Sequence, residues 1–331
     1  MSEAVLPIAA RRHHVVTALA RGLEAACGSR DLGPVVLGVS GGVDSTAMLL
    51  ATSVLAERAE WRIQPIPVHV NHNLRDEADL DASQAAECCS TLGLSCQVVD
   101  AWPERGGEEA RVHRYEALMS VAAASDASWV IAAHHAEDQL ETIIAALGRG
   151  AGPTGLSGMA QRRPLGDGVD LVRPLLHVTK ADLKSLCQAA DVSWREDPTN
   201  HEPTTLRGRL RRDVLPVLEE LWPGAARRSA VNAEVVRAAS AVLAREVDSI
   251  FGEETSWSRD ELRQLDPALR VAGIQRALGR AGLGPDAIDT GTLHDLARAI
   301  DDGGEHGRCF EFTGGIRVQL TAGTVSIVEA D

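Results

Sequence analysis

The sequence predicts an α/β protein, in which a parallel sheet with helices on both faces precedes a smaller, mainly helical domain that ends in a short β-hairpin. Short apolar runs alternate with stretches of helical periodicity through residues 35–147, which is the pattern of a parallel sheet. The first apolar run leads directly into a glycine-rich loop. Residues 308–328 alternate between apolar and polar side chains around Gly-Gly and Ala-Gly turns, which predicts the terminal hairpin.

The predicted strands are short apolar runs that are bounded by glycine, proline or polar residues. We expect them at 35–39, 63–70, 95–99 and 129–133. In parallel sheets of this kind, ligands bind beyond the carboxyl ends of the strands. The segments that follow these strands are therefore the first candidates for a functional site.

The helices are predicted from amphipathic periodicity and from polar residues that can cap their starts. In the first region they are expected at 8–27, 46–57, 76–92, 108–125 and 137–147. Residues 148–170 are rich in glycine and proline and are expected to form a loop. A helix is expected at 178–190 with Thr179 as its cap, a basic helix follows at 207–221, and residues 225–299 are largely helical in pattern.

The chain has 331 residues, which suits about two domains, and we place them at 1–218 and 219–331 with no further domain after them. No apolar segment is long enough for a membrane span, so no membrane partner is expected. The six cysteines form no CxxC pair, and a reducing cytoplasm is the expected location.

Acidic residues outnumber basic ones by 47 to 33, giving a formal net charge of -14, which argues against a nucleic-acid partner. The charge is unevenly distributed, however. Residues 1–159 carry 11 basic and 20 acidic side chains, residues 160–230 carry 12 and 10, and residues 231–331 carry 10 and 17. Only the middle segment is net positive, so it is the part that could meet RNA phosphates. Its arginines cluster at Arg207, Arg209, Arg211 and Arg212, although a solvated helix paired with neighbouring acids explains them as well.

The loop Ser40-Gly41-Gly42-Val43-Asp44-Ser45 lies between the first strand and a helix. Small residues let backbone N–H groups approach an anion closely, and a helix N-terminus adds partial positive charge. The loop is not a GxxxxGK[ST] phosphate loop. Asp44 would repel phosphates, and its natural use is to hold Mg²⁺, although it could also cap the helix. The alternative to a phosphate site is an ordinary Gly-Gly turn.

Two further segments follow strands. His69–His72 ends the second strand, and its backbone could meet an adenine edge. His134, Asp138 and Glu141 follow the fourth strand at a spacing that places them on one face of a helix. Two carboxylates and a histidine there could hold Mg²⁺ or orient an amine nucleophile, and a capped helix start with solvated acids is the alternative.

Arg111 and Arg114 lie in the helix between these two segments. Arginine there could neutralise a phosphate as charge develops in a transition state. A solvated helix face with charge pairs explains them equally well.

The order of these segments is more specific than any one of them. The loop resembles the PP-loop of ATP pyrophosphatases, and residues 35–222 as a whole resemble the tRNA(Ile)-lysidine synthetase family, which implies a Rossmann-like PP-loop ATPase domain. The segments that carry the resemblance are VSGGVDS, HVNHNLRDEA, EEARVHRYEAL, AAHHAEDQLETIIAALGRGAGPTGLSGM, VRPLLHVTKADL, WREDPTNHEPTTLRGRLRRDVLPVLEEL and the closing GGIRVQL.

The resemblance implies a two-step ligase. ATP adenylates the C2 carbonyl oxygen of the wobble cytidine in tRNA(Ile) with anticodon CAU, free L-lysine attacks C2 through its ε-amine, and AMP leaves. The product reads AUA rather than AUG, and the tRNA changes from methionine to isoleucine identity. The resemblance also implies Mg²⁺ with the ATP, and many members of the family are homodimers.

Carried over residue by residue, the resemblance implies several groups of site residues. ATP would be bound by Ser40, Gly41, Gly42, Val43, Asp44, Ser45, His69, Arg111 and Arg114. Catalysis would depend on Asp44, Asp138, His134 and Arg207, with Mg²⁺ on Asp44 and Asp138. Lysine would be held by Asp138 and Glu141, and tRNA by Arg207, Arg209, Arg211 and Arg212.

Three positions depart from the family pattern: Asn73 replaces glycine, Glu137 replaces aspartate, and Gly208 replaces asparagine. Glycine weakens a helix interior by about 1 kcal/mol relative to alanine, so Gly208 bears on the geometry near Arg207. A PP-loop tRNA thiolase is the closest alternative, but its chemistry needs sulfur-carrying cysteines. A catalytically inactive RNA-binding or nucleotide-binding protein is a third interpretation, which the retained Asp44 and the later acid cluster disfavour.

Overall fold

The computed structural model describes residues 6–72, 78–103, 107–195, 205–284, 287–302, 307–312 and 314–329. The chain divides into two compact units: unit 1 contains residues 1–142 and 158–231, and unit 2 contains residues 143–157 and 232–331. Each unit has a hydrophobic core of its own. The domain boundary expected between residues 218 and 219 stays a prediction.

Unit 1 is built on a six-stranded sheet with the strand order β3-β2-β1-β4-β6-β5. Neighbouring strands are parallel, except that β5 is antiparallel to β6 at one edge. The predicted parallel sheet is therefore confirmed, with one antiparallel strand added. The strands are β1 (Asp31–Gly38), β2 (Arg62–Asn71), β3 (Gln97–Asp100), β4 (Trp129–Ile131), β5 (Arg162–Gly166) and β6 (Val169–Val172).

The loop predicted over 148–170 is wrong for much of its length. It contains the short helix α7 (Pro153–Leu156) and most of the β5–β6 hairpin. Asp167 and Gly168 form the turn of this hairpin, with φ angles of 49° and 77°. An Asp-Gly pair favours such a two-residue turn, because both of its positions need positive φ. The glycines here therefore marked a hairpin rather than a loop.

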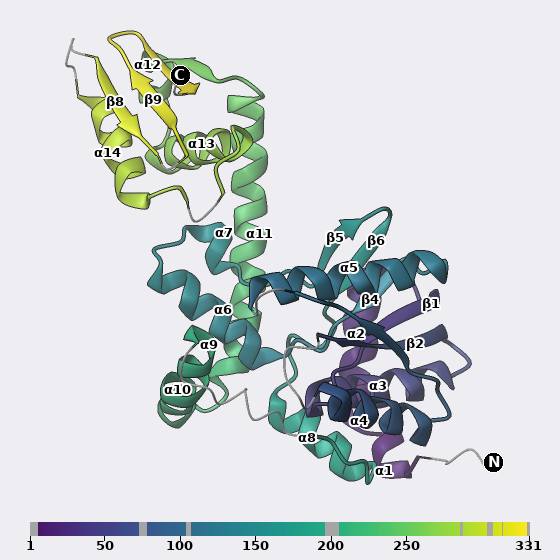
Figure 1. Cartoon of the computed structure of the whole chain (residues 1–331). Coiled ribbons are helices and arrows are strands. Elements are labelled where there is room, and N and C mark those ends of the chain that lie inside the picture. Colours follow the sequence, from purple (N-terminus) through teal and green to yellow (C-terminus); the bar gives the residue numbers. More distant parts are fainter. Residues whose placement is uncertain are drawn as a thin grey trace. The chain divides into compact units, whose positions relative to one another are not determined.

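Helices cover both faces of the sheet, as predicted (Figure 1). Because alternate residues of a strand point to opposite sides, Val35 and Leu37 pack in one core and Val36 packs in the other. α2, α3, α4 and α8 contribute to the first core and α5 to the second. The helices that begin in this part of the chain are α1 (Ile8–Arg11), α2 (His14–Cys27), α3 (Val43–Ala56), α4 (Ala78–Thr91), α5 (Glu108–Ala124), α6 (Ala136–Gly148) and α8 (Lys180–Ala189).

Capping residues decide where several of these helices start. The single helix predicted over 8–27 is two helices, because His13 has extended backbone angles and its ring accepts the N–H of Val15 at 3.4 Å. The cap predicted for α8 is confirmed, since Thr179 and Asp182 form a capping box, although the helix begins at Lys180 rather than at residue 178. The start expected for α4 at residue 76 lies outside the described residues.

The predicted basic helix is interrupted by a wider turn. α9 (Leu206–Arg209) leads into the π-helical turn η2 (Leu210–Val214), which is followed by α10 (Leu215–Leu221). Pro216 has no N–H, and its ring would clash with the carbonyl four residues earlier, so regular α-helical hydrogen bonding cannot run through this point. The widened turn carries Arg211.

Unit 2 combines helices with a four-stranded antiparallel sheet of order β7-β10-β9-β8. The predicted terminal strands are confirmed, but β7 interrupts the region expected to be helical. Trp257 of β7 pairs with Val325 and packs against Phe251 in the core, which explains why a short segment after a helix is extended. The remaining elements are α11 (Ala225–Phe251), β7 (Ser256–Ser258), α12 (Arg259–Gln264), α13 (Pro267–Arg280), α14 (Thr290–Asp301), β8 (Arg308–Glu311), β9 (Ile316–Leu320) and β10 (Thr324–Glu329).

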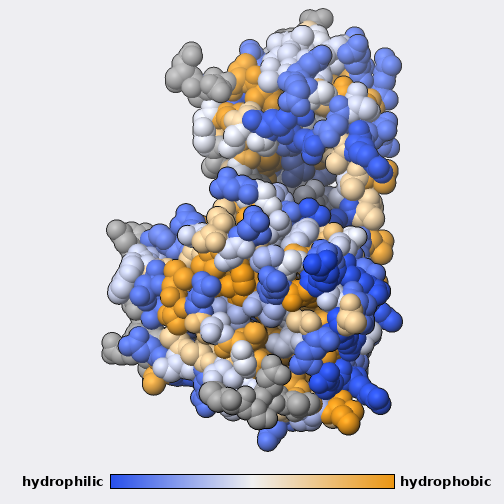
Figure 2. All heavy atoms as spheres, turned by 90° about the vertical axis from the view of Figure 1, so that its right-hand side faces the viewer, coloured by the Kyte–Doolittle hydropathy of each residue, from blue (hydrophilic) through white to orange (hydrophobic). Residues whose placement is uncertain are grey.

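Hydrophilic and hydrophobic side chains are interspersed on the surface that Figure 2 shows. Across the described residues, no helix is both long and apolar enough to span a membrane.

Candidate active site

Two segments of unit 1 meet where the strand order of the sheet reverses. β1 lies between β2 and β4, and Leu37 of β1 pairs with Ile131 of β4. Residues 40–45 follow β1 and residues 132–135 follow β4, so both segments leave the carboxyl edge of adjacent parallel strands. Ligands bind at such reversal points in parallel sheets. The predicted phosphate loop and the predicted acid cluster are therefore neighbours in space.

The loop after β1 is closed by hydrogen bonds between its serines. The Ser45 hydroxyl accepts the N–H of Ser40 at 3.0 Å and donates to the Gly42 carbonyl at 3.1 Å. Gly42 is the N-cap of α3, and no side chain caps the start of that helix. The first N–H groups of such a helix are suited to bind a phosphate group.

Gly41 allows the chain to turn from β1 into this loop. Its φ of 80° lies in the left-handed region that other residues disfavour. A Cβ at this position would lie 3.3 Å from the carbonyl oxygen of Asp81 in α4. Both the backbone conformation and the space therefore require glycine.

His135 links the two segments. Its side chain is 3% exposed and lies among three carboxylates. Nδ1 is 2.9 Å from Glu137 Oε2, and Nε2 is 3.4 Å from Asp138 Oδ2 and 3.6 Å from Asp44 Oδ2. Burial alone would lower the pKa of His135, but these carboxylates raise it to about 10. The ring is therefore an imidazolium ion that neutralises part of the acid cluster.

Asp138 uses both of its oxygens within the protein. Oδ2 accepts the backbone N–H of His135 at 3.0 Å, which caps the start of α6. Oδ1 accepts a hydrogen bond from Arg211 Nη2 at 2.7 Å. Burial would raise the pKa of Asp138, but His135 and Arg211 lower it to about 2. The carboxylate is thus ionised and held by cations on two sides.

Glu141 lies one turn further along α6 and is 1% exposed. It accepts a hydrogen bond from Arg211 Nε at 2.5 Å. Burial raises the pKa of Glu141, and the arginine opposes this rise. One guanidinium group therefore bridges the two carboxylates that are predicted to bind lysine.

His134 lies before α6 rather than on it, since the helix begins at Ala136. Burial lowers the pKa of His134 to about 3 against the opposing effect of Asp138, so the ring is neutral. Its Nδ1 is buried with no hydrogen-bond partner among the described residues. A neutral imidazole with one unused nitrogen can form a hydrogen bond to a bound substrate.

The other candidates for ATP binding lie on β2 and α5. The His69 ring is buried, with Nδ1 2.9 Å from the carbonyl oxygen of Val39. The backbone of His69 is therefore better placed than its ring to contact adenine. Arg111 and Arg114 both lie against Tyr115, with guanidinium carbons 5.9 and 5.8 Å from the ring centre. Their role in ATP binding stays a prediction.

The four arginines predicted to bind tRNA differ in their surroundings. Arg207 and Arg209 are exposed on α9. Arg212 forms an ion pair with Asp213 at 2.7 Å, and Arg211 reaches the acids of α6. Arg207 and Arg209 are therefore the pair best placed to meet a phosphate backbone.

Comparison with known proteins places this site in a family. The model of the PP-loop domain matches residues 15–218. The tRNA(Ile)-lysidine synthase of Salinispora arenicola is 36% identical over 277 residues, which are 82% of this chain and 78% of that protein. The chain belongs to the tRNA(Ile)-lysidine synthase family. The enzyme of the same name from Xanthomonas campestris pv. campestris is 36% identical over 276 residues, but there the match spans only 62% of the relative.

Among solved structures, the U34-tRNA thiolase NcsA of Methanococcus maripaludis superimposes with a TM-score of 0.56. It is 16% identical, and the match covers 67% of this chain and 78% of the thiolase, so the likeness concerns the fold alone. The family match, by contrast, makes this lysidine synthase family member an ATP-using ligase that modifies tRNA.

Asp44 fits the Mg²⁺ that is expected with ATP better than Asp138 does. Asp44 Oδ1 is buried and has no hydrogen-bond partner among the described residues, while Oδ2 faces His135. A carboxylate oxygen left in this way suits a hard cation that also binds phosphate oxygens. Both oxygens of Asp138 are already engaged.

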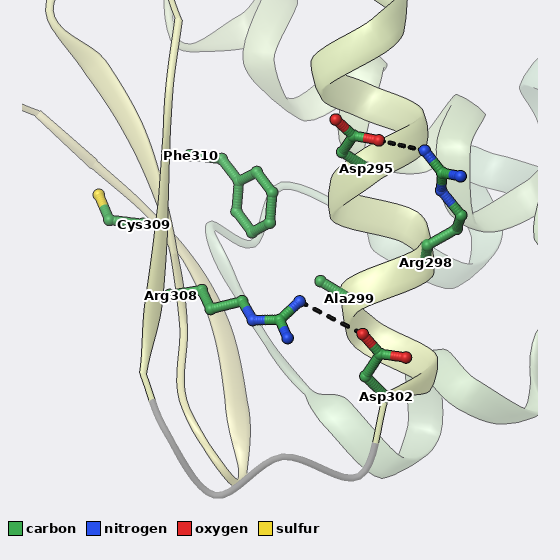
Figure 3. A pocket seen from close by; sticks show the side chains of 7 residues that line it. All are labelled: Asp295, Arg298, Ala299, Asp302, Arg308, Cys309 and Phe310. Carbon is green, nitrogen blue, oxygen red and sulfur yellow. Dashed lines mark hydrogen bonds and ion pairs between the residues drawn. The ribbon is translucent and has the colours of Figure 1, made fainter.

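A hollow in unit 2 does not have the chemistry of a phosphate-binding site (Figure 3). It lies between α14 and β8, and the ring of Phe310 faces it. Its two arginines pair with aspartates: Arg298 with Asp295, and Arg308 with Asp302 at 3.3 Å. With both charges paired, the hollow offers little attraction to a phosphate group.

The sequence interpretation assigned no role to three residues that the structure places here. His135 joins the acids, and Glu137 accepts the backbone N–H of Lys180 at 3.0 and 3.1 Å, which ties the start of α8 to the site. The Gln139 side chain is 1% exposed and forms two hydrogen bonds with the backbone of Met159. The only signal for them is a run of polar residues directly after a strand, which does not reveal their partners.

Proposed function

We propose that this enzyme adenylates the C2 oxygen of the wobble cytidine in tRNA(Ile) with a CAU anticodon and then joins free L-lysine to C2, which yields lysidine, AMP and pyrophosphate. The observation that carries the proposal is the meeting of the phosphate loop with the acids of α6 around one buried histidine. Asp44 Oδ2 and Asp138 Oδ2 approach the same nitrogen of His135. Residues suited to ATP and residues suited to an amine therefore share one site.

The first step needs the ATP phosphates to be held while the cytidine oxygen attacks the α-phosphorus. The N–H groups at the start of α3 and the turn at Gly41 would hold the phosphates. Asp44 would hold Mg²⁺, which neutralises charge on the phosphate oxygens. The neutral ring of His134 would form a hydrogen bond to the base or to the phosphate.

The second step needs an uncharged ε-amine, because an ammonium ion has no lone pair with which to attack C2. Asp138 and Glu141 together hold one guanidinium group, a pairing that suits a cationic amine as well. The low pKa of Asp138 favours holding the lysine cation. The pKa of Glu141, which burial raises, favours accepting its proton before the attack. By the resemblance of the sequence to the family, Asp138 is also expected to accept the proton of the amine, and this expectation stays a prediction beside the role proposed for Glu141.

The tRNA would be held by exposed arginines near the site. Arg207 and Arg209 lie on α9, which leads directly into the turn that carries Arg211. Arginine side chains that neutralise phosphates make binding depend on salt. The bases of an anticodon loop are unpaired, so the target cytidine can leave the stack and enter the site.

The thiolase alternative finds no support in the cysteines. Cys88, Cys89 and Cys187 are buried, and Cys309 belongs to unit 2. Within the described ranges, no group of three or more histidine, cysteine or acidic side chains is arranged to hold a metal ion or cluster.

The proposal is tested with ATP, Mg²⁺, labelled lysine and tRNA transcripts that differ only at the wobble base. Label is expected in the tRNA(Ile) transcript with a CAU anticodon and not in the same transcript with U or G at the wobble position. Release of AMP should accompany it in equal amount. Incorporation of label into every transcript, or none into the CAU transcript, would contradict the proposal.

A further inference from the structure

We infer that His135 is a positioning residue for both half-reactions: it holds Asp44 and Asp138 in one arrangement, in which Oδ1 of Asp44 is left to face the substrates. The inference rests on the proposed function, because it assigns Asp44 to adenylation and Asp138 to the lysine step.

The two carboxylates use their oxygens differently. Nε2 of His135 approaches Oδ2 of Asp138 at 3.4 Å and Oδ2 of Asp44 at 3.6 Å. Oδ1 of Asp138 meets Arg211, and Oδ1 of Asp44 has no partner among the described residues. Asp138 is already held by the backbone N–H of His135 and by Arg211, so the ring nitrogen sets the orientation of Asp44 relative to it.

The ring lies between acids of two separate elements. Asp44 lies at the start of α3, in the segment after β1, and Asp138 at the start of α6. Their Oδ2 atoms approach the same ring nitrogen, which separates the two carboxylates and gives both the same neighbour. The ring thereby links acids from two separate elements at one site.

The His135 ring is itself held in place. Its Nδ1 is 2.9 Å from Glu137 Oε2, and Glu137 is fixed in turn by the backbone N–H of Lys180 at the start of α8. The ring is 3% exposed, so it does not touch bulk solvent and is unsuited to contact the tRNA itself. Its effect on the reaction is therefore exerted through the two aspartates.

The experiment compares variants that keep different nitrogen positions of the ring. In His135→Gln the side-chain amide can reach the place of Nε2, between the aspartates. In His135→Asn the shorter amide reaches only the place of Nδ1, beside Glu137. His135→Ala retains neither, and His113→Gln serves as the control, because His113 is a half-exposed histidine on α5 that also lies near two glutamates.

Adenylation is measured as pyrophosphate release with tRNA and ATP in the absence of lysine, and transfer as incorporation of labelled lysine. For His135→Ala and His135→Asn we expect kcat to fall about 100-fold in both assays, while KM for ATP and for lysine changes less than about threefold. His135→Gln should stay within about tenfold of the wild type in both assays. The His113→Gln control should be unchanged.

Each variant is first checked for a cooperative melting transition, and the Gln and Asn variants suffice if the Ala variant does not fold. Equal activity of the Gln and Asn variants, or an effect on one half-reaction alone, would overturn the inference. A wild-type enzyme that incorporates no lysine would instead overturn the proposed function, so the two failures are distinguishable.

Discussion

The guanidinium group of Arg211 lies 2.5 Å from Glu141 and also bridges to Asp138, so an arginine from the widened turn η2 neutralises acids of α6. Glu141 is almost completely buried and has no contact with solvent to replace this partner. The pair joins segments that are 70 residues apart in sequence. The stability of this part of unit 1 should therefore depend on it.

We expect Arg211→Met to lower the free energy of unfolding by about 2–4 kcal/mol, because the substitution leaves a buried carboxylate without its cation. Adding Glu141→Gln to the same chain should restore about half of the loss, since the buried charge is then removed as well. Urea denaturation of the two single variants and the double variant measures both effects. Additive losses in the double variant would show that the two side chains are not coupled.

Replacing Asp138 by asparagine should impair lysine transfer while leaving the fold intact. We expect Asp138→Asn to lower lysine transfer by at least about 100-fold, since a neutral amide can neither hold the lysine cation nor accept its proton. The amide oxygen can still accept the N–H of His135, so the start of α6 should persist. Labelled-lysine incorporation, with circular dichroism for the fold, tests this. Full transfer in a folded variant would remove Asp138 from the reaction.

Gly41→Ala should weaken ATP binding in addition to lowering the stability of the fold. The residue has a φ of 80°, and the added Cβ would press against Asp81, so we expect a loss of about 1–2 kcal/mol in stability. KM for ATP should also rise by about tenfold. Gly28→Ala is the matched control, because Gly28 has a φ of 70° but no atom within 4 Å of the added Cβ. That variant should lose stability without any change in KM.

Asp182 should make the free energy of unfolding of unit 1 depend on pH. Burial opposes its ionisation, but Thr179 and Arg227 lower its pKa to about 2. The pKa of an aspartate carboxyl group is about 3.9 in an unfolded chain. The stabilisation is therefore present above about pH 4 and is lost as the pH falls through about 2.

In measured terms, Asp182→Asn should be less stable than the wild type by about 1–2 kcal/mol at pH 7. The difference should shrink as the pH approaches about 2, and denaturant titrations at several pH values follow it. Asp260→Asn alters an exposed ion pair on α12 and should change stability by less than about 0.5 kcal/mol. A difference for Asp182 that stays constant with pH would contradict the assignment.

The exposed arginines of α9 should contribute to tRNA affinity through phosphate contacts. We expect the double variant Arg207→Ala/Arg209→Ala to bind the CAU transcript at least about tenfold more weakly at low salt, and to show a shallower dependence on salt. Arg62→Ala is the control, because Arg62 lies at the start of β2, at the opposite edge of the sheet from the site loops. Unchanged affinity of the double variant at every salt concentration would exclude α9 from the tRNA contact.

The alternation of apolar runs and amphipathic stretches was sufficient to predict the central strands and the helices on both faces. That pattern is local, because a buried parallel strand needs only a short apolar run. The hairpin at Asp167-Gly168 was missed since its strands are short and partly polar, and glycine and proline nearby favour a loop equally well. β7 was missed for a related reason: Trp257 is extended only because Phe251 and Val325 lie beside it.

The phosphate loop, the acids after the fourth strand and the net positive middle segment could all be identified from the sequence alone, because each consists of neighbouring residues whose chemistry can be recognised without knowledge of their contacts. Their partners became evident only in the folded chain. The fold brings His135 between Asp44 and Asp138, and it directs Arg211 to Glu141. A buried charge is stable only beside an opposite charge, and that partner can come from any part of the chain that the fold places within a few ångströms.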